Sequence, residues 1–531
     1  MIRSLDGLAL ALAGVVVSAL ALGWWRPEEL FLALLGVIAL RALLRPYRLP
    51  AWSPGRVVPA AVIAYAVVFS FITVTRHWAF RTHALDLGYY VQLLWSVSRG
   101  LGASVSLPEM HAWGDHFSPT LYLLVPLFAL FPGPVFLLVA QSVAFSLGAL
   151  PLFALARRRL GSEGAAAAFA LLYLVSPTLH GINLRDFHAA ALATPLLLAA
   201  VYCFETSRMG WFLASVILTL GCREDAALGV IGLGLWIALA RRRWIWGLAL
   251  VAGSLALFFF ATQVLIPYFR GAPYPHLWRY PHLGGSLGEI LLTMVLRPFR
   301  TLGLMVSVEK LRYLLALLAP LAFLPLRAPL DLLPALPTLA HNLLSLDPVL
   351  FSHRAQYNAF VLPFLLLAAV SGYARLSPRL TVRGRSIRGL ALGLSFLLSL
   401  ALTSRTLNDL AVNRWWLSQR QRAVYALLAQ VPPGEPVSTQ ERFVPHLATR
   451  PKVFIFPVGI EKSEYVLLDG DSYPWRDLPD ARLERTAGEV TLSVAGGEGR
   501  AHYRYQVVRE GQGYLLLRRQ AARKAVRAKM G

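Results

Sequence analysis

Long apolar runs alternate with short polar turns from the start of the chain to about residue 405. Many of these runs approach or reach the roughly 17 to 25 residues that a helix needs to cross the hydrocarbon core of a bilayer. The pattern therefore predicts a polytopic α-helical membrane protein with about 13 transmembrane helices. The expected spans are residues 7–25, 29–44, 57–75, 134–155, 163–177, 189–205, 210–222, 226–240, 244–266, 312–326, 329–344, 357–374 and 389–404.

Two further apolar stretches are residues 117–131 and 290–306. The distribution of arginine indicates whether they cross the membrane. Arginine clusters favour the cytoplasmic side, and each full span reverses the side of everything after it. All clusters share one side only when both stretches are left out of the count, so we expect interfacial helices there. The N-terminus is then cytoplasmic, and residues after about 405 are extracytoplasmic. The clusters lie at residues 45–56, 157–159, 241–243 and 375–388.

The chain after residue 405 has more charge, shorter apolar runs and more turn signals. It predicts a helix over residues 408–431, then a strand–helix–strand unit at VST, RFVPHLA and KVFIFP. Further strands are expected at YVLLD, at EVTLSVAG and in the hairpin YRYQVVREGQGYLLLRR. The predicted organisation is two extra N-terminal transmembrane helices at 1–56, a membrane core at 57–405 with a first outer loop at 76–120, a small extracytoplasmic α/β domain at 406–520 and a basic tail at 521–531.

The composition agrees with a membrane protein, because 56% of the 531 residues are hydrophobic and the mean hydropathy is +0.56. A net charge of +23 would suggest nucleic acid for a soluble chain. Here the arginines lie at span ends, where they report orientation and contact with anionic lipid. We therefore expect the lipid bilayer, and no nucleic acid, as a partner. Cys203 and Cys222 are the only cysteines, which excludes a disulfide framework and a CxxC zinc motif.

The first outer loop carries Asp86 directly before an apolar stripe, LGYYVQLLWSVSRG, that is suited to lying flat at the membrane surface. One interpretation is that Asp86 caps the N-terminus of this helix. The other is that it acts as a general base, taking the proton of an acceptor hydroxyl that attacks a membrane-anchored donor. The two roles are compatible.

Asp115 and His116 precede the second interfacial stretch. They fit a polar helix start with a proline in the first turn. They could equally ligate a divalent cation or polarise a phosphate, although a lone Asp-His pair is a weak metal signal. The cofactor is therefore unknown, with a divalent cation as one possibility.

Arg223, Glu224 and Asp225 lie between apolar runs at 210–222 and 226–240. These runs give only roughly 20 to 22 Å of helix against a hydrocarbon core of roughly 30 Å. The charged tip should therefore lie below the membrane surface, where charge usually lines a functional cavity rather than a snorkelling turn. Arg223 suits a lipid-linked phosphate, and the two carboxylates suit sugar hydroxyls or a metal.

Three other polar stretches are candidate parts of a functional site. An ordinary loop or a membrane interface explains their composition equally well. NLRDFHA carries Asp186 and His188, and YFRGAPYPHLWRYPHLGG interleaves Arg279 with aromatic rings, as in an aromatic belt or a platform for a sugar phosphate. The third stretch carries His353, Arg354 and Tyr357 at the start of a later span.

Several motifs in one order resemble a family of predicted bacterial and archaeal membrane proteins, domain of unknown function 2079. The resemblance covers about residues 76–520, and the family is in turn similar to the GT-C glycosyltransferases, which include the protein mannosyltransferases and the lipid A aminoarabinose transferase. The motifs are LDLGYYVQLLWSVSRG, GDHFSPTLYLLVPLFALFPGP, LPLFALARRRLG, NLRDFHAAAL, CREDAAL, RYPHLGGS and SHRAQYNAFVLPFLLLAA.

The resemblance implies a GT-C-like fold, a polyprenyl-phosphate sugar donor and an acidic catalytic residue in the first outer loop, which Asp86 matches. CREDAAL resembles the cation-acid hairpin of those enzymes. Their pair of adjacent acids is absent, since Leu87 follows Asp86, and this leaves metal dependence open.

We therefore expect a glycosyltransferase of the plasma membrane that acts on an extracytoplasmic acceptor, with Arg223 and Arg279 holding the phosphate. The alternatives are a multi-pass transporter or lipid flippase, in which the same charges form a translocation path, and a catalytically inactive GT-C-like protein. The oligomeric state is left open.

Overall fold

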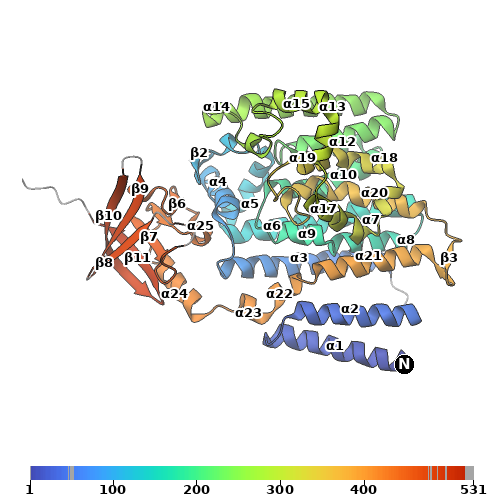
Figure 1. Cartoon of the computed structure of the whole chain (residues 1–531), viewed down its shortest axis with the longest axis horizontal. Coiled ribbons are helices and arrows are strands. Elements are labelled where there is room, and N and C mark those ends of the chain that lie inside the picture. Colours follow the sequence, from blue (N-terminus) through green and yellow to red (C-terminus); the bar gives the residue numbers. More distant parts are fainter. Residues whose placement is uncertain are drawn as a thin grey trace, which may run out of the picture. The chain divides into compact units, whose positions relative to one another are not determined.

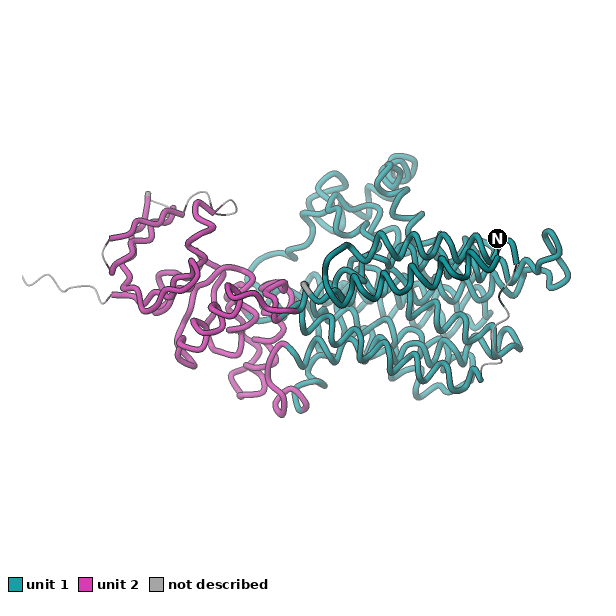
Figure 2. Tube along the Cα trace, turned by 90° about the horizontal axis from the view of Figure 1, so that it is seen from below, with its two compact units in different colours: residues 1–77, 111–126, 135–415 teal, residues 78–110, 127–134, 416–531 magenta. Residues whose placement is uncertain are grey.

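The structure, a computed structural model of the whole chain, describes residues 2–45, 47, 53–475, 478, 481–486, 488–496 and 499–520. The chain forms two compact units (Figure 2). The expected basic tail at 521–531 and Arg48 of the first arginine cluster lie outside the described residues. Unit 1 comprises residues 1–77, 111–126 and 135–415, and unit 2 comprises residues 78–110, 127–134 and 416–531.

Unit 1 is helical, and most of its longer helices run side by side (Figure 1). A two-residue hairpin, β3 (Thr381–Val382) with β4 (Arg385–Ser386), precedes its last long helix. Its helices are α1 (Ile2–Leu22), α2 (Pro27–Leu44), α3 (Pro54–Trp78), α6 (Pro134–Leu147), α7 (Ala149–Leu160), α8 (Glu163–Leu174), α9 (Pro177–Asn183), α10 (Ala193–Glu205), α11 (Met209–Leu220), α12 (Ala226–Leu239), α13 (Trp244–Phe260), α14 (Ile266–Arg270), α15 (Leu287–Leu296), α16 (Pro298–Leu304), α17 (Val308–Leu318), α18 (Pro329–Leu332), α19 (Leu336–Leu344), α20 (Leu362–Ala374), α21 (Ile387–Thr403), α22 (Thr406–Leu410) and α23 (Val412–Trp415).

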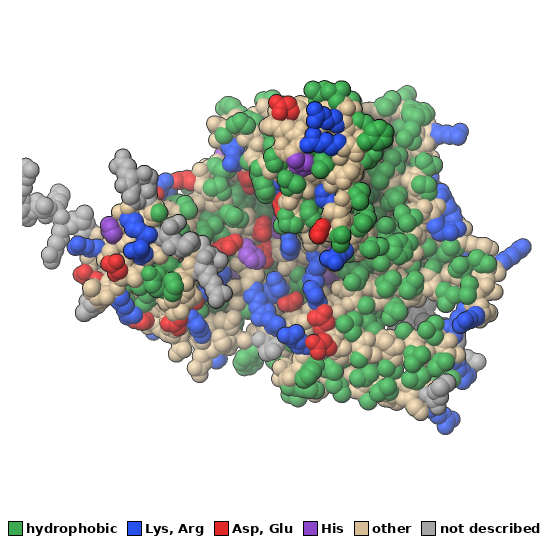
Figure 3. Space-filling view, in the orientation of Figure 1, with side chains coloured by type: hydrophobic (Ala, Val, Ile, Leu, Met, Phe, Trp, Pro, Cys, Tyr) green, Lys and Arg blue, Asp and Glu red, His purple; other side chains and the backbone are tan. Residues whose placement is uncertain are grey.

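Apolar helices of membrane-spanning length confirm the expected class of protein. Hydrophobic side chains cover much of the visible face of unit 1 (Figure 3), as lipid contact requires. Shorter apolar helices such as α11, α12, α20 and α21 accompany the long ones. The predicted total of about 13 spans stays a prediction. The five helical runs long and apolar enough to cross a membrane are Ile2–Leu22, Pro54–Trp78, Pro134–Leu160, Glu163–Asn183 and Trp244–Arg270.

The expected spans at 312–326 and 329–344 are not continuous helices. The first ends as α17 at Leu318, and Ala322 and Phe323 then adopt positive φ angles of 47° and 56°. The second is divided into the single turn α18, the 3₁₀ turn η9 (Leu333–Ala335) and α19. Prolines recur through both stretches, and each removes a backbone donor and disfavours a helical residue before it.

These broken segments pack closely against glycines of neighbouring helices. A Cβ at Gly372 in α20 would overlap the carbonyl of Leu324, and one at Gly232 in α12 would overlap the carbonyl of Pro334. Helices within a membrane associate through such close approaches at small residues. The glycines therefore let the irregular segments enter the core of unit 1.

Unit 2 contains a seven-stranded mixed sheet with the order β6-β5-β7-β11-β10-β9-β8. Strands β6, β5 and β7 are parallel, and the remaining pairs are antiparallel. The predicted strand–helix–strand unit is present as β5, α25 and β6, and the predicted C-terminal hairpin as β10 and β11. The strands are β5 (Val437–Thr439), β6 (Val453–Ile455), β7 (Tyr465–Asp469), β8 (Arg482–Thr486), β9 (Glu489–Gly496), β10 (Gly499–Gly511) and β11 (Tyr514–Arg519), with α24 (Gln419–Leu428) and α25 (Val444–Leu447).

The predicted helix at 408–431 was wrong, because this stretch forms three short helices, α22, α23 and α24. Ala411 is extended, and α24 starts anew at a capping box in which Ser418 and Gln421 satisfy each other's backbone N–H groups. A serine three residues before a glutamine is a sequence signal for such a start. Strand β8 was not predicted.

Part of the first outer loop belongs to unit 2, as π-helical η1 (Ala84–Gly88), α4 (Tyr89–Ser98), β1 (Ser104–Ser106) and β2 (Glu109–His111). Helix α4 is buried on nearly all sides from Tyr89 to Leu94, so it does not present one apolar face to a membrane surface as expected. Its Gln92 amide donates to the carbonyl of Arg450 at 3.2 Å, and Ser106 Oγ donates to the carbonyl of Val453 at 2.7 Å. These bonds join the loop to the sheet.

Candidate functional site

The turn between α11 and α12 places Arg223, Glu224 and Asp225 in the interior of unit 1, where all three are buried. Thr120 anchors this turn, because its N–H donates to the carbonyl of Gly221 at 2.9 Å and its hydroxyl donates to the carbonyl of Leu218 at 2.7 Å. A Cβ on Gly221 would overlap the Thr120 hydroxyl. The structure therefore buries the charged hairpin tip within unit 1, and its depth below the membrane surface stays a prediction.

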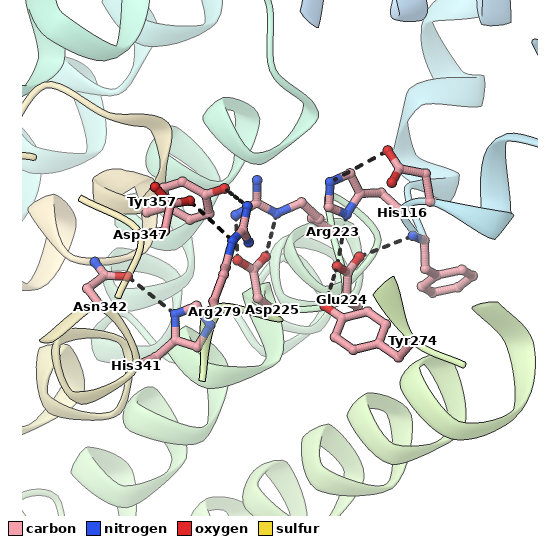
Figure 4. A network of polar contacts seen from close by, with 12 residues as sticks. His116, Arg223, Glu224, Asp225, Tyr274, Arg279, His341, Asn342, Asp347 and Tyr357 are labelled. Atoms are coloured by element: carbon pink, nitrogen blue, oxygen red, sulfur yellow. Dashed lines mark hydrogen bonds and ion pairs between the residues drawn. The ribbon is translucent and has the colours of Figure 1, made fainter. Parts of the chain in front are cut away.

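Glu224 is the centre of a hydrogen-bonded network (Figure 4). Its carboxylate accepts from the backbone N–H of Phe117 at 3.2 Å and from the hydroxyl of Tyr274 at 3.0 Å, and it lies 2.9 Å from Nδ1 of His116. Burial disfavours charge on both groups, but their mutual attraction outweighs it. The pKa of Glu224 is therefore lowered and the pKa of His116 is raised.

Asp115, His116 and His276 form a group that could hold a divalent cation. Each offers one ligand atom, and these atoms lie within 4.8 Å of one another. The two imidazole rings stack at 4.6 Å, and the buried Nε2 of His276 has no hydrogen-bond partner among the residues that the structure describes. Burial lowers the pKa of His276, and the neutral imidazole is the form that binds metal. Glu224 on Nδ1 of His116 is the usual second partner of a metal-binding histidine.

Arg223 and Arg279 lie on the other side of the network, and each is paired with a carboxylate. The Arg223 guanidinium grips Asp225 through two nitrogens, with Nε 2.6 Å from Oδ1. Arg279 Nε lies 3.3 Å from a carboxylate oxygen of Asp347, and its Nη2 donates to the hydroxyl of Tyr357 at 2.7 Å. Both guanidinium carbons also approach the Tyr357 ring, at 4.8 and 5.2 Å from its centroid. Neither predicted phosphate ligand is therefore a free cation.

Arg354 belongs to a different group of charges, which we call the Arg354 group: Arg76, Arg185, Arg354 and Arg405. Arg354 is half-buried and has no hydrogen bond or ion pair among the described residues. Burial first, and then the charges of Arg405, Arg185 and Arg76, lower its pKa, although Asp409 opposes them. Positive charge is therefore concentrated here and only partly neutralised.

A close contact with α9 holds the loop that carries Arg354. Gly181 of α9 lies directly beneath it, since a Cβ there would overlap the Cα and Cβ of Arg354. Charges of the Arg354 group also act on His353. Burial, followed by the charges of Arg354 and Arg405, lowers the pKa of His353 to about 4. His353 is thus neutral at physiological pH.

Asp186 and His188 fold onto Gln141 in unit 1. The Gln141 amide donates to the carbonyl of Asp186 at 2.7 Å and accepts from the N–H of His188 at 2.9 Å. Both side chains are buried, and Asp186 has a φ of 65°. The structure therefore gives this loop a defined, tightly held backbone.

Asp86 lies in unit 2, in the first turn of η1, and its side chain is partly exposed. The predicted N-cap role was wrong, because His83 occupies the capping position.

Sequence reasoning missed three partners in this site. Tyr274 and His276 were noted only as members of an aromatic and cationic stretch, and Asp347 was not singled out at all. Asp347 sits in a local turn in which its carboxylate accepts from the N–H of Val349 at 3.0 Å. An aspartate next to a proline predicts such a turn, but nothing in the sequence predicts its pairing with Arg279.

Comparison with known proteins decides the family. Residues 76–516 match the predicted membrane proteins grouped as DUF2079. The chain belongs to this family. No curated protein matches it in sequence.

The DUF2079 protein is similar in fold to ArnT of Cupriavidus metallidurans. The crystal structure of ArnT bound to undecaprenyl phosphate has a TM-score of 0.53 at 13% identity, over 89% of this chain and 99% of that one. The apo ArnT structure gives 0.52 at 13% identity, over 88% and 98%. The similarity confirms the GT-C-like fold with a C-terminal sheet domain.

Proposed function

We propose that this DUF2079 protein is an integral membrane glycosyltransferase of the plasma membrane, which transfers a sugar from a polyprenyl-phosphate donor to an extracytoplasmic acceptor. The fold agrees with this proposal, and one structure of similar fold, that of ArnT, is bound to undecaprenyl phosphate. The observation in this chain that carries the proposal is the Arg354 group.

The Arg354 group has the charge and position to receive a lipid-linked phosphate. Within the described part of the chain, two of its four arginines have carboxylate partners: Asp409 lies 3.2 Å from Arg76, and Glu28 lies 3.4 Å from Arg405. Arg76 is in the last turn of α3, and Arg354 and Arg405 flank α20 and α21. A phosphate at the ends of these apolar helices would neutralise the unpaired, half-buried Arg354 and accept its hydrogen bonds.

In the proposed reaction Asp86 acts as the general base. The bond between the anomeric carbon and the phosphate oxygen breaks, the acceptor oxygen bonds to that carbon, and Asp86 takes the proton of the acceptor hydroxyl. The phosphate leaves with the electron pair. The course is either inverting or retaining.

The remaining predicted residues are proposed to line the sugar site. Glu224, Asp225, Asp115 and His116 offer hydrogen bonds to hydroxyls, with Asp186 and His188 as further candidates. The Asp115, His116 and His276 group could add a divalent cation, which would polarise a phosphate oxygen. Arg223 and Arg279 are already paired, so we assign the first contact with phosphate to Arg354. Arg223 would instead orient Asp225, and Arg279 would orient Tyr357.

Two substitutions separate binding from transfer. Arg354→Gln should weaken binding of undecaprenyl phosphate, measured by native mass spectrometry, by about 10- to 100-fold, because it removes hydrogen bonds to a charged group. Asp86→Asn should abolish sugar transfer in reconstituted membranes and leave this binding intact. Matched controls are Arg56→Gln, at the opposite end of α3 from Arg76, and Glu484→Gln, an exposed acid in unit 2.

Unchanged lipid binding by Arg354→Gln would remove the phosphate assignment, and unchanged turnover by Asp86→Asn would remove the catalytic one. A transporter or an inactive relative would bind the lipid without any transfer that depends on Asp86.

A further inference from the structure

A second, strongly cationic site lies at the other end of the helices of unit 1. It is a pocket with a volume of about 770 Å³, formed where α7, α10, α12 and α20 end and where α11 and α13 begin. Five arginines and two carboxylates line it: Arg158, Arg159, Arg241, Arg243, Arg375, Glu205 and Asp331.

The inner part of the pocket is electrically balanced. Arg159 and Arg241 both pair with Glu205, and both lie near Asp331, at 3.7 and 3.9 Å. The indole N–H of Trp236 donates to Asp331 at 2.8 Å. Two cations and two anions thus form a paired floor, of which all members but Arg241 are largely buried.

The rim carries the excess charge. Among the described residues, the guanidinium groups of Arg158 and Arg243 have no hydrogen bond or ion pair, and both residues are exposed. In this same described part of the chain, the Arg375 guanidinium has one hydrogen bond, to the neutral carbonyl of Arg327. Five arginines less two carboxylates leave a net charge of +3 around the pocket. Capping of helix ends does not account for Arg158 and Arg243, because neither side chain donates to a carbonyl of a residue that the structure describes.

This pocket is separate from the buried charges around Glu224. Asp225 precedes α12 and Arg241 follows it, and this helix has 14 residues. At 1.5 Å per residue the two sites are about 20 Å apart along the helix. A ligand of the pocket therefore does not belong to the proposed glycosyl-transfer site.

The surroundings place the pocket at the depth of lipid headgroups. Trp244, Ile245 and Trp246 at the start of α13 are exposed at its edge, as in the aromatic belts that mark a membrane interface. Lys and Arg side chains also gather at this end of unit 1, on the right in Figure 3, beside the hydrophobic surface. Basic pockets between helices at the cytoplasmic side suit anionic headgroups.

We infer that this pocket binds a phosphate group, and specifically that of an anionic membrane lipid, between Arg158, Arg243 and Arg375. The three rim guanidinium groups supply charge-assisted hydrogen bonds, and the paired floor holds Arg159 and Arg241 in place beneath them. The inference is independent of the proposed transfer reaction.

The test compares two triple variants that remove equal charge. The pocket variant is Arg158→Gln, Arg243→Gln and Arg375→Gln. The control is Arg157→Gln, Arg242→Gln and Arg379→Gln, which alters neighbouring arginines that do not line the pocket. Cardiolipin binding to the full chain is measured by native mass spectrometry, and thermal stabilisation is compared for cardiolipin and for inorganic phosphate.

Cardiolipin should bind the pocket variant about 100-fold more weakly than the wild type, since each rim guanidinium group that donates a hydrogen bond to the phosphate contributes about fivefold. The control should bind nearly normally. Equal losses in both variants, or no loss in the pocket variant, would overturn the site. Stabilisation by inorganic phosphate equal to that by cardiolipin would keep the phosphate site and overturn the lipid as its source. If the triple variant does not fold, the exposed single change Arg243→Gln gives the same comparison against Arg242→Gln.

Discussion

His353 gives unit 1 a pH dependence of stability that can be measured. Its pKa is about 4 in the folded chain, against an ordinary value of 6.5. As the pH falls below 6.5 the unfolded chain binds the proton first, so the free energy of unfolding decreases until about pH 4 and is unaffected above 6.5. His353→Gln should therefore flatten the fall in melting temperature of the detergent-solubilised protein across this window. A difference between variant and wild type that stays constant with pH would contradict the burial and cationic surroundings of His353.

At the same scale, the sequence identified most of the charged residues in the site but not how they pair. The short apolar runs around Arg223, Glu224 and Asp225 drew attention to these charges, and the structure buries all three. The partners of Glu224 come from segments about a hundred and about fifty residues away, and local patterns carry no information on such contacts. The pairing of Arg223 with Asp225 is local, only two residues apart, and it makes a phosphate-binding role for Arg223 less direct.

The hairpin of α11 and α12 depends on its contact with the 3₁₀ segment η3 (Pro119–Leu124). Gly221→Ala should push Thr120 away, because the new Cβ overlaps the Thr120 hydroxyl, and the hydrogen bond to Leu218 would be lost. We expect a loss of roughly 1–3 kcal/mol in the free energy of unfolding. Thr120→Ala in the same chain removes the clashing atom and should recover part of that loss, as a double-mutant cycle in denaturant would show.

Gly210→Ala, at a glycine whose Cβ would meet no atom within 4 Å, is the matched control and should change stability little. An additive cycle for Gly221 and Thr120 would contradict the proposed contact.

Among the elements, strands were predicted better than helix breaks. Apolar and polar residues that alternate between turn residues predicted β5, β6, β7, β9, β10 and β11. This pattern fits few structures other than a strand. Apolar continuity failed at 312–344, where 3₁₀ turns that contain prolines interrupt the expected spans, and at 408–431, where Ser418 restarts the helix. Apolar runs show what is buried, whereas proline and capping residues determine where a helix stops.

For the whole molecule, composition was sufficient for the class of protein but not for the division into units. Residues 78–110 are assigned to the same unit as the C-terminal sheet, more than 300 residues later. Hydrogen bonds from Gln92 and Ser106 reach the segment around β6, and the sequence around both residues has the composition of an ordinary loop. Long-range pairing of this kind depends on backbone carbonyls, which every sequence offers.

The sidedness of the chain is the prediction on which both proposed sites depend, and it can be tested in cells. The native Cys203 and Cys222 are buried, with 9% and 0% exposure, so the wild type should take up little membrane-impermeant maleimide. Val458→Cys, at an exposed position of unit 2, should label in intact cells.

Arg379→Cys, exposed in the turn before β3, should label only after permeabilisation, because the arginines from 375 to 388 favour the cytoplasm. The opposite result would place the arginine-lined pocket outside the cell and the Arg354 group inside. A polyprenyl-phosphate donor in the outer leaflet could then not reach Arg354. The side of the membrane from which Val458→Cys and Arg379→Cys are labelled therefore decides whether the donor has access to the proposed transfer site.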